Sequence, residues 1–304
     1  MESICRFFLL LYRLRCKINT SINMKINHRI NISINICINI CINTRKRGDF
    51  MQIIAVANQK GGVGKTTTST VLASGLYSKG HRVLLCDLDP QTNASFMTGV
   101  DVLSVANLYD VFKGEKTVKE TIVPVRLGFD LLPGSLLLAA ADSEFTQTGR
   151  EYMLKEALDS IKEQYDYIVI DTPPTLGILV TNALTAANKL IIPVGAGDIF
   201  SLQGLTQFYG IIQNVRKYCN HELQISGLLI TRYNSRSNVN QALKGQVQQI
   251  AEQMETKVFK AAIRESVSVK ESQLLKEDLF EQAPRSNAAK DYQAFIREFL
   301  EGEV

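Results

Sequence analysis

Short apolar runs alternate along the chain with longer segments in which apolar residues recur every three or four positions. Runs of this kind are typical of parallel strands buried on both faces, and five occupy residues 51–57, 82–87, 165–171, 190–194 and 223–231. The longer segments predict helices at residues 151–163, 176–187, 201–217, 239–254 and 287–300. This alternation predicts an α/β fold with a doubly wound, mostly parallel sheet and helices on both faces.

The first fifty residues follow a different pattern, in which Ile and Asn alternate almost strictly between residues 18 and 43. A β-strand is one interpretation, but the run is long and contains no turn residues. A targeting segment is another, although the apolar core at residues 7–12 is short and no small-residue cleavage site follows. Ile, Asn and Lys have AT-rich codons, as expected if upstream DNA is translated. The DNA that encodes residues 47–50 can contain a bacterial ribosome-binding sequence. We therefore expect a start at Met51, with a disordered basic extension as the alternative.

Composition and charge narrow the class of protein. Hydrophobic residues make up 45% of the chain and charged residues 21%, which excludes a wholly disordered, collagenous or coiled-coil protein. The net charge is +4, but the first fifty residues hold nine Lys or Arg against two Asp or Glu, so the remainder is slightly acidic. Only Cys86 and Cys219 of the six cysteines lie beyond residue 50, and such isolated thiols fit a reducing cytoplasm.

A glycine-rich segment between the first strand and the next helical pattern carries the clearest chemistry. Residues 58–68 read Asn-Gln-Lys-Gly-Gly-Val-Gly-Lys-Thr-Thr-Thr, and the helical pattern that follows ends at Gly80. This is the context of a phosphate-binding loop, in which backbone N–H groups and the helix N-terminus hold phosphate oxygens. Lys65 would reach the β- and γ-phosphates, and Thr66 would ligate Mg²⁺. The expected ATP-binding residues of the loop are Lys60, Gly61, Gly62, Val63, Gly64, Lys65, Thr66 and Thr67.

The loop departs from the common G-x-x-x-x-G-K-[ST] pattern, because Gln59 stands at its first position and a second lysine, Lys60, follows. The form K-G-G-V-G-K-T resembles the deviant Walker A class of P-loop NTPases, which includes ParA/Soj, MinD, the nitrogenase iron protein and the arsenite-pump ATPase. The resemblance implies that Lys60 crosses the interface of an ATP-bound dimer and reaches the partner's nucleotide. A cation supplied in this way makes phosphate binding depend on dimerisation, as an arginine finger does.

Carboxylates follow two further strands, at the edge where open α/β sheets bind ligands. Asp87 and Asp89 lie in the sequence Asp-Leu-Asp-Pro-Gln, which is similar to an acidic motif of the ParA/Soj branch. That resemblance assigns Asp89 to the attacking water and Asp87 to support of the metal and the loop. Asp171 ends an apolar strand before Thr-Pro-Pro, a Walker B pattern whose carboxylate holds Mg²⁺. The expected catalytic residues are Lys60, Lys65 and Asp89, and the expected metal ligands are Thr66, Asp87 and Asp171.

Other branches of the class fit less well. A MinD-like protein ends in a basic amphipathic membrane helix, whereas residues 288–304 hold four acidic and two basic residues. An iron protein needs cysteines that bridge a cluster between subunits, but Cys86 lies on a predicted core strand and Cys219 at a helix end. The tyrosine-rich tail of bacterial tyrosine kinases of this fold is absent from the sequence. The small, Soj-like partition ATPases remain.

The ParA/Soj resemblance implies ATP-dependent DNA binding without sequence preference. Residues 232–276 contain eight Lys or Arg against four Glu, enough to neutralise several phosphates, although a solvated face of mixed charge is the alternative. Ser268 stands where the family has one of its DNA-contacting arginines, so Arg264 or Lys270 would substitute for it. Loops around Arg232 and Arg264 are expected to border the adenine. The expected DNA contacts are Arg236, Lys244, Lys260 and Lys270.

Together these motifs resemble a ParA/Soj-type ATPase in a single P-loop domain, residues 51–304, with ATP and Mg²⁺ as cofactors. The resemblance implies a homodimer on ATP that binds double-stranded DNA and segregates a plasmid, chromosome or mobile element. A ParB-like centromere-binding protein would stimulate its slow hydrolysis. We expect a cytoplasmic, nucleoid-associated protein without stable membrane association. A positioning ATPase for a protein cargo and a MinD-like membrane-associated regulator are the alternatives.

Overall fold

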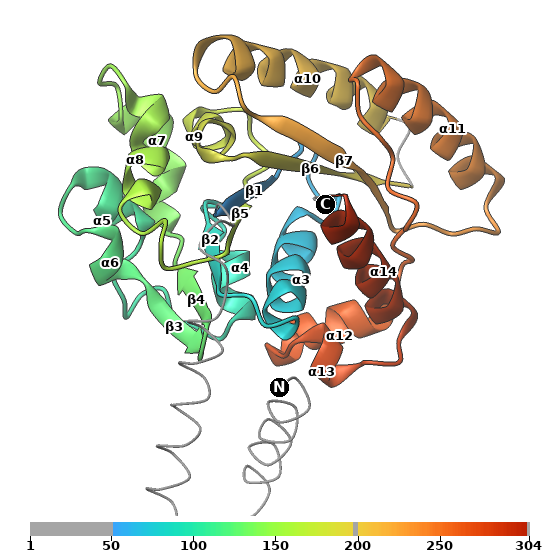
Figure 1. The fold of residues 1–304 in the computed structure, drawn as a ribbon, viewed down its shortest axis with the longest axis horizontal. Coiled ribbons are helices and arrows are strands. Elements are labelled where there is room, and N and C mark those ends of the chain that lie inside the picture. The colour runs from blue at the N-terminus through green and yellow to red at the C-terminus, as the bar shows by residue number, and fades with distance from the viewer. Residues whose placement is uncertain (1–50, 197–199, 303–304) are drawn as a thin grey trace, which may run out of the picture. The chain divides into compact units, whose positions relative to one another are not determined.

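A seven-stranded, mostly parallel β-sheet forms the centre of the fold (Figure 1). The computed structural model describes residues 51–196 and 200–302, so the expectations for residues 1–50 lie outside the described residues. The strand order is β3-β4-β2-β5-β1-β6-β7, and β3 pairs antiparallel to β4 while the other neighbours are parallel. The strands are β1 (Gln52–Val56), β2 (Val83–Asp87), β3 (Val123–Arg126), β4 (Phe129–Leu132), β5 (Tyr167–Asp171), β6 (Lys189–Gly195) and β7 (Gln224–Thr231).

Each face of the sheet has its own apolar core, because successive side chains of a strand point to opposite faces. In β1, Ile54 and Val56 join one core, whereas Ile53 and Ala55 join the other. The first core includes residues of α3 (Lys65–Ser78), α4 (Asn93–Met97), α13 (Leu279–Gln282) and α14 (Asn287–Glu301). The second core includes residues of α5 (Leu108–Lys113), α6 (Val118–Thr121), η1 (Leu136–Ala140), α7 (Ala141–Glu144), α8 (Met153–Asp159), α9 (Ile178–Ala186), α10 (Phe200–Tyr218) and α11 (Asn238–Gln253). Helices on both faces confirm the predicted doubly wound fold.

The C-terminal helix α14 packs directly beside α3, the helix that follows the phosphate loop (Figure 1). The approach is close because Gly75 of α3 faces α14, and a Cβ atom at this position would overlap Ile296. Tyr292 of α14 also shares a hydrogen bond of 3.3 Å with the Thr68 hydroxyl of α3, and both residues are buried. The end of the chain is therefore fixed to the element that carries the nucleotide motif.

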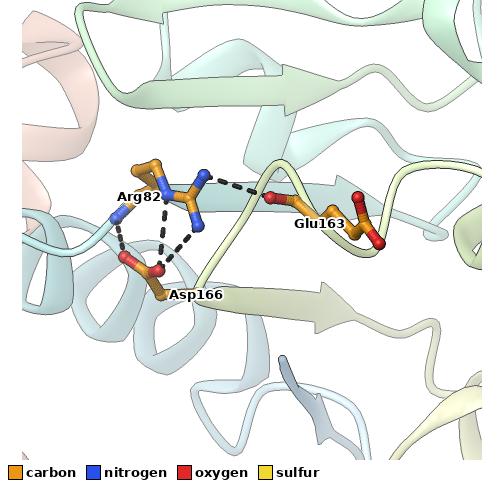
Figure 2. A network of polar contacts seen from close by, with 3 residues as sticks. All are labelled: Arg82, Glu163 and Asp166. Atoms are coloured by element: carbon orange, nitrogen blue, oxygen red, sulfur yellow. Dashed lines mark hydrogen bonds and ion pairs between the residues drawn. The ribbon is translucent and has the colours of Figure 1, made fainter. Parts of the chain in front are cut away.

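A polar cluster at the start of β2 and β5 holds these two strands in register (Figure 2). The Arg82 Nε and Nη2 atoms donate to Asp166 Oδ1 at 3.3 and 2.9 Å, and the Arg82 backbone N–H donates to Asp166 Oδ2 at 2.7 Å. Arg82 Nη1 also donates to the Glu163 carbonyl at 3.1 Å. With the strand starts joined in this way, the register ends with Asp87 of β2 opposite Asp171 of β5. The cluster thereby helps to place two of the predicted acidic residues side by side.

The predicted strands and long helices are present, and most of their ends differ from the prediction by one or two residues. The helix expected at residues 151–163 is shorter, because a 3₁₀ turn, η2 (Arg150–Tyr152), precedes α8, which ends at Asp159. The pattern did not predict β3, β4, the short helices α4 to α7, α12 (Val267–Leu275) or α13. Except for α12, these elements span four to six residues, too few for a helical or alternating pattern, and none of them is a continuous apolar run. In the described part of the chain, no helix is long and apolar enough to cross a membrane.

Candidate functional site

The loop between β1 and α3 has the backbone geometry of an anion-binding turn. Gly62 and Gly64 adopt φ angles of +73° and +86°, which residues with a Cβ atom rarely reach. Gly64 is the N-cap of α3, and its carbonyl accepts the Thr68 N–H at 2.9 Å. The N–H groups of residues 65–67 precede that bond, and a helix offers no internal partner to such groups. With the helix dipole, they form a site suited to phosphate.

Two buried side chains hold the phosphate loop against neighbouring strands. Asn58 donates from Nδ2 to the Pro193 carbonyl of β6 at 2.7 Å, and its Oδ1 accepts the Lys60 N–H at 3.0 Å. Thr231 at the end of β7 donates to the Val63 carbonyl at 2.8 Å. These contacts fix the two ends of the loop. Neither side chain has a role that the sequence alone predicts, since an isolated Asn or Thr carries no signal without its distant partner.

Lys65, the first residue of α3, is buried where the phosphate loop ends, and the residue is only 6% exposed. Its Nζ donates to the Lys60 carbonyl at 2.9 Å. Burial lowers the pKa of the Lys65 ammonium, and the negative charges of Asp171 and Asp89 act in the opposite direction. The structure thus brings together Lys65, Lys60, Asp89 and Asp171, as the motifs predicted. The Lys60 side chain is half-buried.

Asp171 ends β5 and is fully buried beneath the start of α3. The Ser69 hydroxyl donates to its Oδ1 at 3.0 Å, while its Oδ2 is buried and accepts no hydrogen bond from the described residues. Burial raises the pKa of Asp171 above its usual range, the neighbouring Asp87 raises it further, and the hydroxyls of Thr66 and Ser69 lower it. A carboxylate in this state favours a nearby cation.

Asp87 and Asp89 order the loop that follows β2. Asp87 Oδ2 accepts the N–H and the hydroxyl of Ser95 at 2.8 and 2.7 Å, and its Oδ1 accepts the Asp89 N–H at 3.2 Å. Burial raises the pKa of Asp87, and these hydrogen bonds partly offset the effect. Asp89 Oδ1 accepts the Gln91 N–H at 3.0 Å. Both oxygens of Asp87 are engaged by the protein, which favours its predicted support of the loop; its contact with the metal stays a prediction.

The residues present fit Mg²⁺ bound together with a nucleotide. Asp171 offers an unpartnered, buried Oδ2 atom, and Thr66 lies close enough to affect the pKa of Asp171. Among the described residues, no group of three or more His, Cys, Asp or Glu side chains is arranged to hold a metal ion. Mg²⁺ suits such a site, because it commonly takes one or two protein ligands and fills its shell with phosphate oxygens and water.

The two arginines expected near the adenine have different surroundings. Arg232 follows β7 with a φ of +54°, and its Nη1 lies 3.9 Å from the position that a Cβ atom on Gly62 would occupy. Arg264 instead contacts α14, where its Nε and Nη2 donate to the two carboxylate oxygens of Asp291 at 2.8 and 2.6 Å. The structure therefore brings Arg232 to the phosphate loop and pairs Arg264 with Asp291. Their contacts with adenine stay predictions.

The four expected DNA contacts are all exposed, although they lie in four different segments of the chain. Arg236 lies in the loop between β7 and α11, Lys244 on α11 and Lys270 on α12. Lys260 lies between α11 and α12, and its backbone N–H donates to Glu298 of α14 at 2.9 Å. These four basic side chains thus lie outside the core and are available to a partner of opposite charge.

Comparison with known proteins agrees with this geometry. The family described as an AAA domain matches residues 51–225. Over 250 residues, the chain is 37% identical to the sporulation initiation inhibitor protein Soj of Bacillus subtilis. The aligned region covers 81% of this chain and 97% of Soj. The chain is also 38% identical over 227 residues to the chromosome partitioning protein ParA of Caulobacter vibrioides. This aligned region covers 73% of this chain and 84% of that protein.

A solved structure extends the comparison to the ligands. Cobyrinic acid a,c-diamide synthase of Mycobacterium smegmatis, with a bound ATP analog and magnesium, is 32% identical with a TM-score of 0.72. The match covers 83% of this chain and 94% of that one.

The parallel sheet and the phosphate loop define a P-loop nucleotide hydrolase. The chain belongs to the ParA/Soj family of P-loop ATPases. ATP and Mg²⁺ are its cofactors, in agreement with the ATP analog and magnesium of the related structure. The predicted family, fold class and cofactors are thereby confirmed, and the roles of the individual site residues stay predictions.

Proposed function

We propose that this protein is a partition ATPase that binds DNA as an ATP-dependent dimer and takes part in the segregation of a replicon. The match to Soj, which spans 97% of that protein, carries the proposal. The chromosome partitioning protein ParA of Caulobacter vibrioides, as a second relative, supports the same role. Lys60, which the phosphate loop of a common P-loop protein lacks, supports the dimer.

The surface around the phosphate loop also supports a dimer. Leu136, Leu137 and Leu176 are 59%, 58% and 36% exposed. They follow β4 and β5 at the carboxyl edge of the sheet, the same edge that holds the loop after β1. Exposed leucines are common singly, but three near one ligand site fit a surface that a second copy covers. A face-to-face dimer would bury them and bring each Lys60 toward the partner's nucleotide.

The site residues then have distinct roles in hydrolysis. Asp89, whose carboxylate is held by the Gln91 N–H, orients the attacking water in line with the γ-phosphate. Lys60 and Lys65 neutralise the charge that develops on the phosphate oxygens. Thr66 and Asp171 would hold Mg²⁺, which would further neutralise the phosphate charge.

Nucleotide and DNA binding are linked through the dimer. ATP binds the dimer better than the monomer and so shifts the population toward the dimer. The exposed basic residues of two subunits then contact DNA phosphates without reading the bases, which makes the affinity strongly dependent on salt. A ParB-like centromere-binding partner stimulates the slow hydrolysis and thereby releases the DNA.

The test is binding of the full chain to unrelated double-stranded DNA with ATP, with ADP and without nucleotide, across a series of salt concentrations. The expected result is binding with ATP alone that weakens steeply as salt rises. Lys60→Ala is expected to abolish this binding. Lys79→Ala is the matched control, because Lys79 is an exposed lysine at the opposite end of α3.

Two outcomes would contradict the proposal. If the protein binds ATP but ignores DNA under all conditions, it is not a DNA partition ATPase, and a protein cargo or a membrane becomes the partner to test. If Lys60→Ala binds DNA as well as the unaltered protein does, the role of Lys60 across the dimer is wrong.

A further inference from the structure

Helix α12 is held loosely on the protein. Ser272 is the one residue of this helix that is buried, while Val267, Leu274 and Leu275 are 68%, 78% and 56% exposed. A cavity of about 70 Å³ is lined by residues of both α12 and α3, so the two helices are not closely packed there. Elements with few buried contacts open at low free energy. The partly buried Val269 packs against the core, so the hydrogen bonds of α12 supplement only a few apolar contacts.

Such a hydrogen bond joins α12 to the phosphate loop. Gln273 donates from Nε2 to the Thr67 hydroxyl oxygen at 2.8 Å, and both residues line the cavity. Thr67 is the third residue of α3, and its backbone N–H is one of those that the helix start leaves for an anion. A hydroxyl that accepts one hydrogen bond still has its own proton to donate. The Thr67 hydroxyl can thus serve Gln273 and a phosphate oxygen together.

We propose that Gln273 is a positioning residue for the nucleotide, and that it couples the occupancy of the phosphate loop to the order of α12. Because Gln273 donates to the Thr67 oxygen, it does not accept the proton of the Thr67 hydroxyl. That proton can therefore bond to a different acceptor. Phosphate supplies that acceptor, and the two hydrogen bonds polarise and strengthen each other. Nucleotide therefore stabilises α12, and α12 in turn stabilises bound nucleotide by the same factor, because such coupling is reciprocal.

The consequence for DNA rests on the proposed function. Lys270, an expected DNA contact, lies on α12 one turn before Gln273. Ordering α12 fixes the backbone that carries Lys270 and lowers the entropy that DNA binding would otherwise lose. Gln273 then connects the phosphate loop to the DNA-binding surface within one subunit, in addition to the coupling through dimerisation.

Hydrogen exchange of the full chain tests the coupling without any reference to DNA. Amides of α12 are expected to exchange roughly three- to tenfold more slowly with Mg-ATP or Mg-ADP than without nucleotide, the effect of one hydrogen bond. In Gln273→Ala this nucleotide-dependent difference is lost from α12 but kept in α3. A merely structural role would speed exchange of α12 equally with and without nucleotide.

Two further substitutions sharpen the test. Gln273→Glu has the same shape, but its carboxylate cannot donate and competes with phosphate for the Thr67 proton, so it is expected to lower ATP affinity more than Gln273→Ala does. Gln164→Glu adds the same charge in an exposed loop before β5 and should change neither ATP affinity nor α12 exchange. Unchanged α12 exchange on nucleotide addition, or unchanged ATP affinity in both Gln273 variants, would overturn the proposal.

A DNA-binding experiment tests the link from α12 to DNA separately. In Gln273→Ala at saturating ATP, DNA affinity is expected to fall roughly three- to tenfold while the dimer persists in sedimentation. If the unaltered protein binds no DNA, the proposed function fails, whereas the exchange experiment still decides the role of Gln273. If the protein binds DNA but Gln273→Ala binds it equally well, the link from α12 to DNA is wrong.

Discussion

At the scale of single residues, three buried carboxyl groups lie close together in the nucleotide site. The charges of Asp89 and Asp171 act on the buried Lys65, and repulsion from Asp87 and Asp89 contributes to the raised pKa of Asp171. ATP adds several negative charges at the same place. Mg²⁺ and the predicted cation Lys60 would offset this added charge together with Lys65.

Removal of Mg²⁺ is accordingly expected to weaken ATP binding more than ADP binding, because ATP brings one more phosphate toward the unpartnered Asp171 oxygen. A loss of more than about tenfold for ATP is expected, because the phosphate charges lose the cation that offsets them. Titration of the full chain with a fluorescent ATP or ADP analog, in Mg²⁺ or in EDTA, measures both affinities. Equal losses for the two nucleotides would show that the metal does not act on the terminal phosphate.

Lys65→Met tests the buried ammonium directly, since Met has a similar shape and no charge. A hydrogen bond between charged groups contributes about 1.5–3 kcal/mol, so ATP affinity is expected to fall roughly 10- to 150-fold. The same titration measures the change. Lys79→Met removes an exposed lysine from the far end of α3 and should leave the affinity within about twofold. Similar losses in both variants would indicate a general effect of charge.

At the scale of elements, the sequence pattern predicts those strands and helices whose buried residues form a local apolar run or a regular period. The parallel strands β1, β2, β5, β6 and β7 and the glycine loop were predictable because their apolar runs and turn residues are local signals. β3 was not, since it is a short, partly exposed edge strand with Pro124 in its middle. Helix α12 was not, because it buries a single residue. The bond from Gln273 to Thr67 spans 206 residues, and no local pattern encodes it.

The register of β2 against β5 depends on the polar cluster at their starts. Asp166→Ala removes the acceptor of both the Arg82 side chain and its backbone N–H, and is expected to cost about 1–2 kcal/mol of unfolding free energy. The value lies low in the range for charged groups because the Arg82 side chain is 36% exposed. Asp166→Asn keeps one acceptor and should cost about half as much. Urea unfolding measures the differences.

A matched control for this cluster is the ion pair between Arg126 and Glu281, in which the Glu281 side chain is 64% exposed. Arg126→Ala is expected to change the unfolding free energy by less than about 0.5 kcal/mol. An equal effect of Arg126→Ala and Asp166→Ala would mean that the cluster acts only as a surface ion pair.

Attachment of α14 to α3 gives a second prediction for the elements. Tyr292→Phe removes the hydroxyl that meets Thr68 at 3.3 Å, and the expected cost is about 0.5–1.5 kcal/mol because both groups are buried. For a domain of this size the melting temperature should fall by about 1–6 °C. Differential scanning calorimetry measures it, with Tyr218→Phe as an exposed control. No change in the melting temperature would show that the hydroxyls are satisfied elsewhere.

At the scale of the whole molecule, α14 joins the two predicted functional surfaces. Its Tyr292 contacts α3 directly after the phosphate loop, while its Asp291 and Glu298 hold the backbone of residues 260–264. The segment that leads from Lys260 toward α12 is thus hydrogen-bonded to α14, the helix that also packs against α3. A rigid α14 would keep the basic surface at a fixed distance from the nucleotide.

The basic surface makes a quantitative prediction about salt. Each phosphate contact that a protein makes with duplex DNA contributes about 0.9 to the slope of log affinity against log salt concentration. The double variant Lys260→Ala and Lys270→Ala is therefore expected to reduce the magnitude of that slope by about 2 per subunit engaged, and to weaken binding equally on unrelated sequences. Fluorescence anisotropy with saturating ATP measures the slope.

The matched control replaces Lys116 and Lys119, two exposed lysines beside α6 at the β3 end of the sheet, far from β7 in the strand order. Both double variants remove the same charge, so the general attraction between protein and DNA falls equally in the two. Counterion release, in contrast, depends on direct phosphate contact. A reduced slope in the Lys260 and Lys270 variant alone would therefore locate the DNA on the face that includes α12, whereas equal slopes would place it elsewhere.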